Sequence, residues 1–315
     1  MEKKHTLKTS GITGVVSNKQ NSFVIAEDQC LIKYDLRTDE PLKRLTAKEI
    51  IGLELDEKEE ILYGFNAESI YLVELKSFDI IDIVTIRLPE EYDEWELKRC
   101  YHLEGHLFLL IILVLGDDGD RYAFLYDSDS AYMDLVYRED TDHSMWFDKC
   151  GGLRIIKNDE YRPKSDKNTI SCERKQFYSD VFSVEIAISI FRADQMMVRK
   201  PGVLYYVDPN ERFSLVMEDT HFKMQYVFVD NHSNEIIKRI PAPNRYCPME
   251  ATLIPECECL ALEHTKKIVI FSIKELAFEV KAAVRIDLTF SPPLYFQDTE
   301  QLLILDLEEG TWIDV

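Results

Sequence analysis

The sequence has few of the residues that mark disordered, fibrous or disulfide-rich chains. Glycine and proline number only 11 each among 315 residues, while 46% of the residues are hydrophobic and 30% are charged. Low-complexity, collagen-like and broadly disordered chains are therefore excluded. The seven cysteines are scattered and odd in number, which argues against a disulfide framework and predicts reduced thiols in a cytoplasmic protein.

Long hydrophobic runs are also missing. The longest runs from Leu107 to Leu115, nine residues, and a helix needs about 20 apolar residues to cross a bilayer. The first residues, Met1 to Lys8, include basic side chains but no apolar stretch follows them, so we expect no secretory signal. The sequence thus predicts neither a membrane span nor export.

Motifs that carry chemistry are absent as well. There is no Gly-x-Ser-x-Gly elbow, no Gly-x-x-x-x-Gly-Lys loop and no Gly-x-Gly-x-x-Gly. The cysteines at 247, 257 and 259 with His264 could supply four zinc ligands, but their spacing differs from that of structural zinc sites. We expect Cys257 and Cys259 to pack on one face of a strand. Likewise, Asp117 to Asp120 is interpreted as a hairpin turn, so no metal and no cofactor is expected.

What the sequence does contain is a repeated unit: a short apolar strand, a polar turn and a second short strand. This order of elements is typical of hairpins in all-β proteins. Six apolar strands of this kind are visible, at Leu31–Leu36, Ile70–Leu75, Ala123–Asp127, Tyr226–Asp230, Ile268–Ile273 and Leu302–Leu307. The long gap after Asp127 leaves room for one hidden, degenerate unit or a long loop at 148–190. Seven units average 45 residues, the size of a β-propeller blade.

The repeated strand, its terminal Asp or Glu and the returning strand resemble the third and fourth strands of blades in tryptophan-aspartate repeat propellers. No Trp-Asp dipeptide occurs, and Gly105-His106 is the one Gly-His pair. The resemblance implies an all-β, seven-bladed β-propeller formed by residues 1–315 as one domain. Six or eight blades, or two β domains joined near 148–180, are the alternatives.

Ring closure gives two further expectations. Either His5–Thr9 or Thr311–Val315 should complete the last blade, because closing the ring removes exposed strand edges. Equivalent positions in the blades should be occupied by the residues near the strand ends, namely Tyr34, Val73, Tyr126, Val229, Phe271 and Leu305.

Charge is the other distinctive feature. The chain has 58 acidic and 37 basic residues, a net charge of −21, which disfavours direct binding to nucleic acid or to an anionic membrane. Residues 49–148, called the acidic sector here, hold 26 acidic and only 7 basic side chains. The densest acidic clusters lie within residues 54–60, 90–96 and 134–142 and begin at Glu54, Glu90 and Asp134. We expect these clusters mainly on loops and outer edges of the second and third blades. A solvated face that keeps the protein soluble is the simpler interpretation.

These features predict a protein-interaction module whose acidic surface binds a basic protein, including an inhibitor or immunity-type role toward a basic protein that acts on nucleic acid. Aromatic anchors next to carboxylates would form the contact. The predicted partner-binding residues are Glu90, Glu91, Asp93, Glu94, Trp95, Glu96, Asp140, Asp142 and Trp146. The alternative is a hydrolase or lyase at the mouth of the propeller channel, which inward-facing ionisable side chains would favour.

Overall fold

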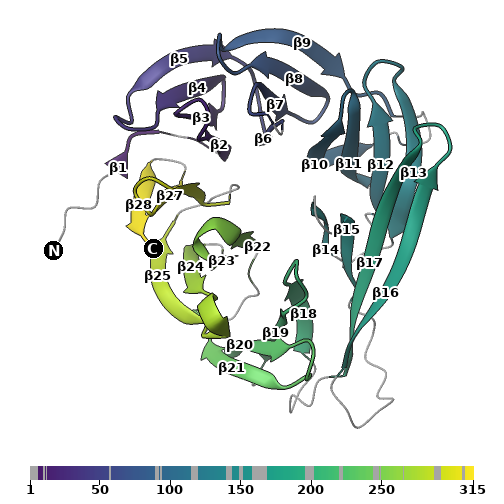
Figure 1. Ribbon diagram of the computed structural model, residues 1–315, viewed down its shortest axis with the longest axis vertical. Helices are drawn as coiled ribbons and strands as arrows, with labels where there is room; N and C mark the ends of the chain where they lie inside the picture. The colour runs from purple at the N-terminus through teal and green to yellow at the C-terminus, as the bar shows by residue number, and fades with distance from the viewer. Residues whose placement is uncertain are drawn as a thin grey trace.

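Seven four-stranded sheets stand in a ring in the computed structural model of the protein (Figure 1). The residues described are 6–9, 11, 13–56, 58–88, 92, 94–114, 120–139, 144–148, 152–157, 169–195, 202–219, 223–243, 248, 250–264, 266–286, 292–306 and 309–315. Within them, the helical segments are two single turns, η1 (Pro255–Cys257) and η2 (Lys274–Leu276). None is long and apolar enough to cross a membrane. The predicted seven-bladed β-propeller is thus confirmed.

Five blades follow the chain order from the innermost to the outermost strand. Blade 1 consists of β2 (Thr13–Ser17), β3 (Ser22–Glu27), β4 (Cys30–Asp35) and β5 (Pro41–Thr46). Blade 2 consists of β6 (Gly52–Leu55), β7 (Ile61–Phe65), β8 (Ser69–Glu74) and β9 (Asp79–Thr85). Blade 3 consists of β10 (Trp95–Glu104), β11 (Leu107–Val114), β12 (Arg121–Asp127) and β13 (Tyr132–Glu139). Figure 1 shows β2, β6 and β10 facing the centre and β5, β9 and β13 on the rim.

Blades 5 and 6 have the same order. Blade 5 consists of β18 (Gly202–Val207), β19 (Phe213–Asp219), β20 (Met224–Asp230) and β21 (Ile236–Pro241). Blade 6 consists of β22 (Glu250–Ile254), β23 (Cys259–His264), β24 (Lys267–Ser272) and β25 (Glu279–Arg285). The expectation that Cys257 and Cys259 pack on one face of a strand is wrong, because Cys257 belongs to the η1 turn and only Cys259 lies on β23. Glu258 then takes a left-handed conformation (φ 49°) before β23 begins.

The core lies between blades rather than inside any one of them. Each of seven buried clusters in the described residues joins side chains of two adjacent blades. Strand β11 shows why: Phe108 and Leu110 pack toward blade 2, while Leu109 and Ile111 pack toward blade 4. Because successive side chains of a strand point to opposite faces, a strand between two blades must be apolar throughout. The run from Leu107 meets that requirement.

Blade 4 departs from the common order. It consists of β14 (Ser144–Asp148), β15 (Gly152–Lys157), β16 (Thr169–Ser179) and β17 (Val184–Gln195), arranged β14-β15-β17-β16. Strand β17 pairs in parallel with β15, and the earlier strand β16 occupies the rim. Because the third and fourth positions are filled in reversed chain order, the strand and turn pattern of the other blades does not occur in this part of the sequence.

Blade 7 joins the two ends of the chain. Strands β26 (Leu294–Phe296), β27 (Gln301–Leu305) and β28 (Gly310–Asp314) are completed on the rim by β1 (Thr6–Leu7), which pairs with β28. Tyr34, Val73, Tyr126, Val229 and Phe271 all lie on third strands, as expected. The expectation for Leu305 is wrong: it lies on β27, a second strand, because the N-terminal strand supplies the fourth.

The acidic residue that ends the third strand has a structural role in three blades. One carboxylate oxygen of Asp35 accepts hydrogen bonds from the backbone N–H groups of Arg37 and Thr38. Asp127 and Asp230 accept the same pair of bonds two and three residues ahead. These N–H donors hold the pKa of all three carboxyl groups below its usual value. The repeated Asp thus closes the turn to the rim strand.

Candidate functional site

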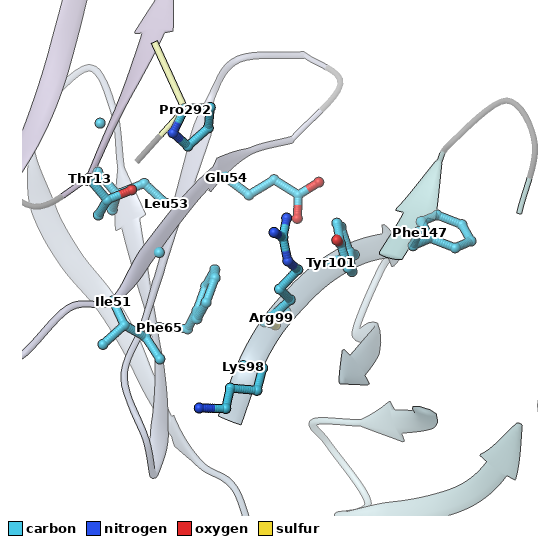
Figure 2. A pocket seen from close by; sticks show the side chains of 13 residues that line it. Thr13, Ile51, Leu53, Glu54, Phe65, Lys98, Arg99, Tyr101, Phe147 and Pro292 are labelled. Carbon is cyan, nitrogen blue, oxygen red and sulfur yellow. The ribbon is translucent and has the colours of Figure 1, made fainter. Parts of the chain in front are cut away.

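A cavity of about 370 Å³ lies between innermost strands of the ring, and Figure 2 shows the residues that line it. It is bounded by β2, β6, β10 and β14, by Phe65 of the second strand β7 and by the segment before β26, so blades 1, 2, 3, 4 and 7 all contribute to it. We call it the axial cavity. Its lining residues are Thr13, Gly14, Ile51, Gly52, Leu53, Glu54, Phe65, Lys98, Arg99, Cys100, Tyr101, Phe147 and Pro292.

A β-bulge shapes one wall of the axial cavity. On β10 the pairing with β11 passes from Leu97 opposite Ile112 to Arg99 opposite Ile111, which leaves Lys98 as an extra residue. In a regular strand two consecutive side chains would point to opposite faces, whereas a bulge re-aims one of them. Lys98 and Arg99 therefore both line the cavity, although they are adjacent in sequence.

Glu54 supplies the opposite charge from blade 2. Its carboxylate accepts a hydrogen bond of 2.8 Å from the backbone N–H of His102, across the boundary to blade 3. Figure 2 shows the Glu54 carboxylate and the Arg99 guanidinium pointing toward one another. The Cys100 thiol and the Tyr63 hydroxyl near Glu54 remain protonated. Burial and the Glu54 charge raise the pKa of the Cys100 thiol well above its usual value. Burial, with Asp56 and Glu54, raises the pKa of Tyr63 to about 12.

The remaining wall is apolar. Ile51, Leu53 and Phe65 come from blade 2, and Phe147 comes from β14 of blade 4. Gly52 allows the Phe65 ring to lie against the strand, because a Cβ at this position would come within 1.9 Å of a ring carbon. The cavity thus combines an apolar wall with three charged side chains, two of them cationic.

Five of the predicted partner-binding residues lie outside the described residues, namely Glu90, Glu91, Asp93, Asp140 and Asp142. Glu94 and Glu96 are exposed, at the beginning of β10. The expectation that such carboxylates lie on outer edges is wrong for Glu54 and Glu96, which are on the innermost strands of blades 2 and 3. The reason is topological: the chain returns from the rim strand of one blade to the centre before the next blade begins.

Both predicted tryptophan anchors are half-buried on innermost strands. Trp95 packs against the cluster between blades 2 and 3. Trp146 packs against the cluster between blades 4 and 5, and its ring stacks on Tyr206 with centroids 6.4 Å apart. Each therefore contributes to the contact between blades, and a role in partner binding stays a prediction for both.

Among the described residues of the acidic sector, the exposed large hydrophobic side chains are Ile51, Ile81, Ile83, Tyr132 and Leu135. The two most exposed lie on β9, the rim strand of blade 2. Ile81 is 58% exposed and Ile83 is 48% exposed. Ile81 is the extra residue of a bulge in the pairing of β8 with β9. Asp79 and Asp82 are exposed on the same strand, and Asp79 forms a 2.9 Å ion pair with Lys43 of blade 1. We call Asp79, Ile81, Asp82 and Ile83 the β9 patch.

Several exposed carboxylates of blades 2 and 3 have no counter-charge. Asp82 of the β9 patch forms no ion pair within the described part of the chain, and the same holds for Glu68, Glu74, Glu94 and Glu104. Exposed carboxylates without partners leave a net negative potential over this part of the surface. No group of three or more His, Cys, Asp or Glu side chains among the described residues is arranged to hold a metal ion.

Sequence reasoning missed the axial cavity. Its only signal was the pair Lys98-Arg99, two of the seven basic residues in the acidic sector, next to each other in a strand. Glu54 belongs to an acidic cluster, and nothing in the sequence indicates that it lies near Arg99. Pairing of β10 and contact between blades bring these residues together, and neither can be read from local sequence.

Comparison with known proteins shows the fold and no family. No protein-family model and no curated protein matches the chain. A crystal structure of an oligogalacturonate lyase from Vibrio parahaemolyticus superposes with a TM-score of 0.57 at 7% identity, covering 98% of this chain and 90% of the lyase. A crystal structure of a eukaryotic initiation factor gives a TM-score of 0.47 at 9% identity, covering 98% of this chain and 92% of that one. The likeness to the lyase shows a shared propeller fold, and no family match supports a tryptophan-aspartate repeat.

Proposed function

We propose that the protein is an interaction module whose acidic sector binds a basic protein. The observation that carries this proposal is the β9 patch, where two exposed isoleucines lie beside exposed carboxylates. Protein interfaces typically have an apolar centre within a polar, charged rim. A basic partner would place apolar side chains on Ile81 and Ile83 and its cations against Asp82 and other exposed carboxylates of blades 2 and 3.

Charge and apolar contact would act at different stages of binding. Exposed carboxylates attract a cationic partner over about a Debye length, ~8 Å at physiological salt, and so increase the association rate. Each exposed ion pair adds at most ~1 kcal/mol to affinity. Desolvation of the two isoleucines would slow dissociation. The same chemistry suits an inhibitor or immunity-type protein that neutralises a basic, nucleic-acid-acting partner.

A charge-reversal experiment tests this function. The partner is first isolated by affinity capture from host lysate, and its association rate is then measured at low and high salt. Reversing Glu68, Glu74 and Asp82 together to Lys should slow association at least roughly tenfold at low salt. The matched control reverses the exposed carboxylates Glu185, Glu235 and Glu279 of blades 4, 5 and 6, with the same change in net charge.

The control separates local from global charge. We expect the variant of blades 4, 5 and 6 to associate at close to the wild-type rate, because its altered side chains lie on other blades. Circular dichroism checks that both variants are folded. Equal slowing of the two variants, or no slowing of either, would leave the acidic sector as a solubility feature and contradict the proposal.

A second candidate function is a hydrolase or lyase that uses the axial cavity. It is supported by the inward-facing ionisable side chains of Glu54, Arg99 and Tyr101. Oligogalacturonate is the first substrate to assay, since a lyase acting on it shares the fold. Turnover by the wild type that is lost in Glu54→Gln would support this candidate, and an absence of turnover would contradict it for this substrate.

A further inference from the structure

We propose that the axial cavity is a binding site for a small organic carboxylate with a flat apolar body, with Lys98 and Arg99 as its anion-binding side chains. The proposal goes beyond the interaction function, because it concerns the centre of the ring rather than the rim. It also needs no chemical step. The cavity volume of about 370 Å³ is in the range of small-molecule sites.

The placement of positive charge is the first argument. The acidic sector has only seven basic residues, and two of them line this cavity. The bulge at Lys98 lets two consecutive residues line the cavity. Figure 2 shows the Arg99 side chain extending toward Glu54 and the Lys98 side chain extending in another direction. Bulges that re-aim a side chain are frequent next to binding sites. In a chain of net charge −21, the cavity lining holds two cations and one anion.

The second argument concerns how these cations are held. Glu54 is fixed by the backbone N–H of His102, and its carboxylate faces the Arg99 guanidinium. A guanidinium has five N–H donors in a planar fork, so a side chain oriented by one carboxylate can still donate to a second. Lys98 forms a 2.6 Å ion pair with Glu96, and both side chains are exposed. Such a pair in water is weak enough to exchange for a ligand carboxylate.

The third argument is the apolar wall. Ile51, Leu53, Phe65 and Phe147 line the cavity together with the two cations. Aromatic and branched side chains facing a few convergent polar groups are the usual composition of a small-molecule site. A ligand would place its flat body against this wall and its carboxylate on the Arg99 guanidinium. The Lys98 side chain extends away from Arg99 in Figure 2, so it would turn from Glu96 to reach the same carboxylate. A neutral ligand of the same shape would leave the cations without the ionic contact.

A matched pair of probes tests this inference: 3-phenylpropionate and its neutral analogue 3-phenylpropionamide. Their dissociation constants for the isolated full-length protein are measured by ligand-observed NMR titration and calorimetry. We expect the carboxylate to bind at least tenfold more tightly than the amide. The double variant Lys98→Gln/Arg99→Gln should reduce this preference at least tenfold. The control Lys76→Gln/Arg87→Gln removes the same charge from exposed positions of the acidic sector and should retain it.

Two results would overturn the proposal. One is wild-type protein that binds neither probe or binds both equally. The other is an unchanged preference in the double variant. Because Arg99 is half-buried, loss of binding in the double variant is checked with the single variant Lys98→Gln, which changes only an exposed position. This variant should weaken binding of the carboxylate and leave binding of the amide unchanged. Because this titration contains no partner protein, its failure would say nothing about binding at the β9 patch. Likewise, failure of the charge reversal at Glu68, Glu74 and Asp82 would say nothing about ligand binding in the axial cavity.

Discussion

Removing the last strand of blade 7 should cost far more than trimming a tail of five residues normally does. Deletion of residues 311–315 removes most of β28, which lies between β27 and the N-terminal strand β1. Trp312 is only 8% exposed and packs edge-to-face on Phe296, with ring centroids 4.5 Å apart. The truncation therefore exposes an apolar cluster and separates the two ends of the chain.

The magnitude follows from these contacts. Loss of a buried Trp side chain costs about 3–5 kcal/mol. The deletion also removes four of the five residue pairs with β27 and one of the two with β1, and each backbone hydrogen bond contributes about 1 kcal/mol net. The sum, about 6 kcal/mol or more, is comparable with the entire stability of a typical domain, about 5–15 kcal/mol.

Thermal melting and urea unfolding measure this effect. A shorter truncation, lacking only residues 314–315, is the control, because Asp314 is exposed and Val315 is half-buried. We expect about 1 kcal/mol for the control and a melting midpoint lower by roughly 10 °C or more for the longer truncation. Trp312→Ala should account for about half of the difference between them. An unchanged melting midpoint after the five-residue truncation would refute the closure of the ring by β28 and β1.

Two further predictions concern single residues. Gly152→Ala should destabilise by about 2–4 kcal/mol, because a Cβ there would lie 2.2 Å from the Ala187 carbonyl oxygen; Gly105→Ala, also at positive φ but in open space, should cost only about 1 kcal/mol. Equal costs in urea unfolding would contradict the steric reasoning. Burial raises the pKa of Glu263 to about 8, so between pH 4.5 and 8 the folded protein keeps a proton that the unfolded chain has released. The free energy of unfolding therefore falls as pH rises from about 4.5 toward 8. Glu263→Gln should flatten that decline in melting temperature, and an unaltered pH profile would contradict it.

The repeated unit shows how much of the fold was available from sequence. Alternation within short strands and the Asp that accepts from residues two and three ahead are local features, as at Asp35, Asp127 and Asp230. Local features can be recognised from neighbouring residues alone. The all-β class and five hairpins of the ring could therefore be predicted. Blade 4 could not, because β16 and β17 reverse the usual chain order.

The sequence by itself determined most of the strands and their turns, the approximate length of a blade and the uneven distribution of charge. Only the tertiary structure decided which residues meet at the centre of the ring. Glu54 reaches the backbone of His102, 48 residues away. Whether Lys98 becomes the extra residue of a bulge depends on how β10 pairs with β11. Local alternation specifies the faces of one strand, whereas the axial cavity arises from pairing registers and from contacts between blades. Both the registers and the contacts depend on how segments far apart in sequence pack together, so they cannot be predicted from the local pattern of a single sequence.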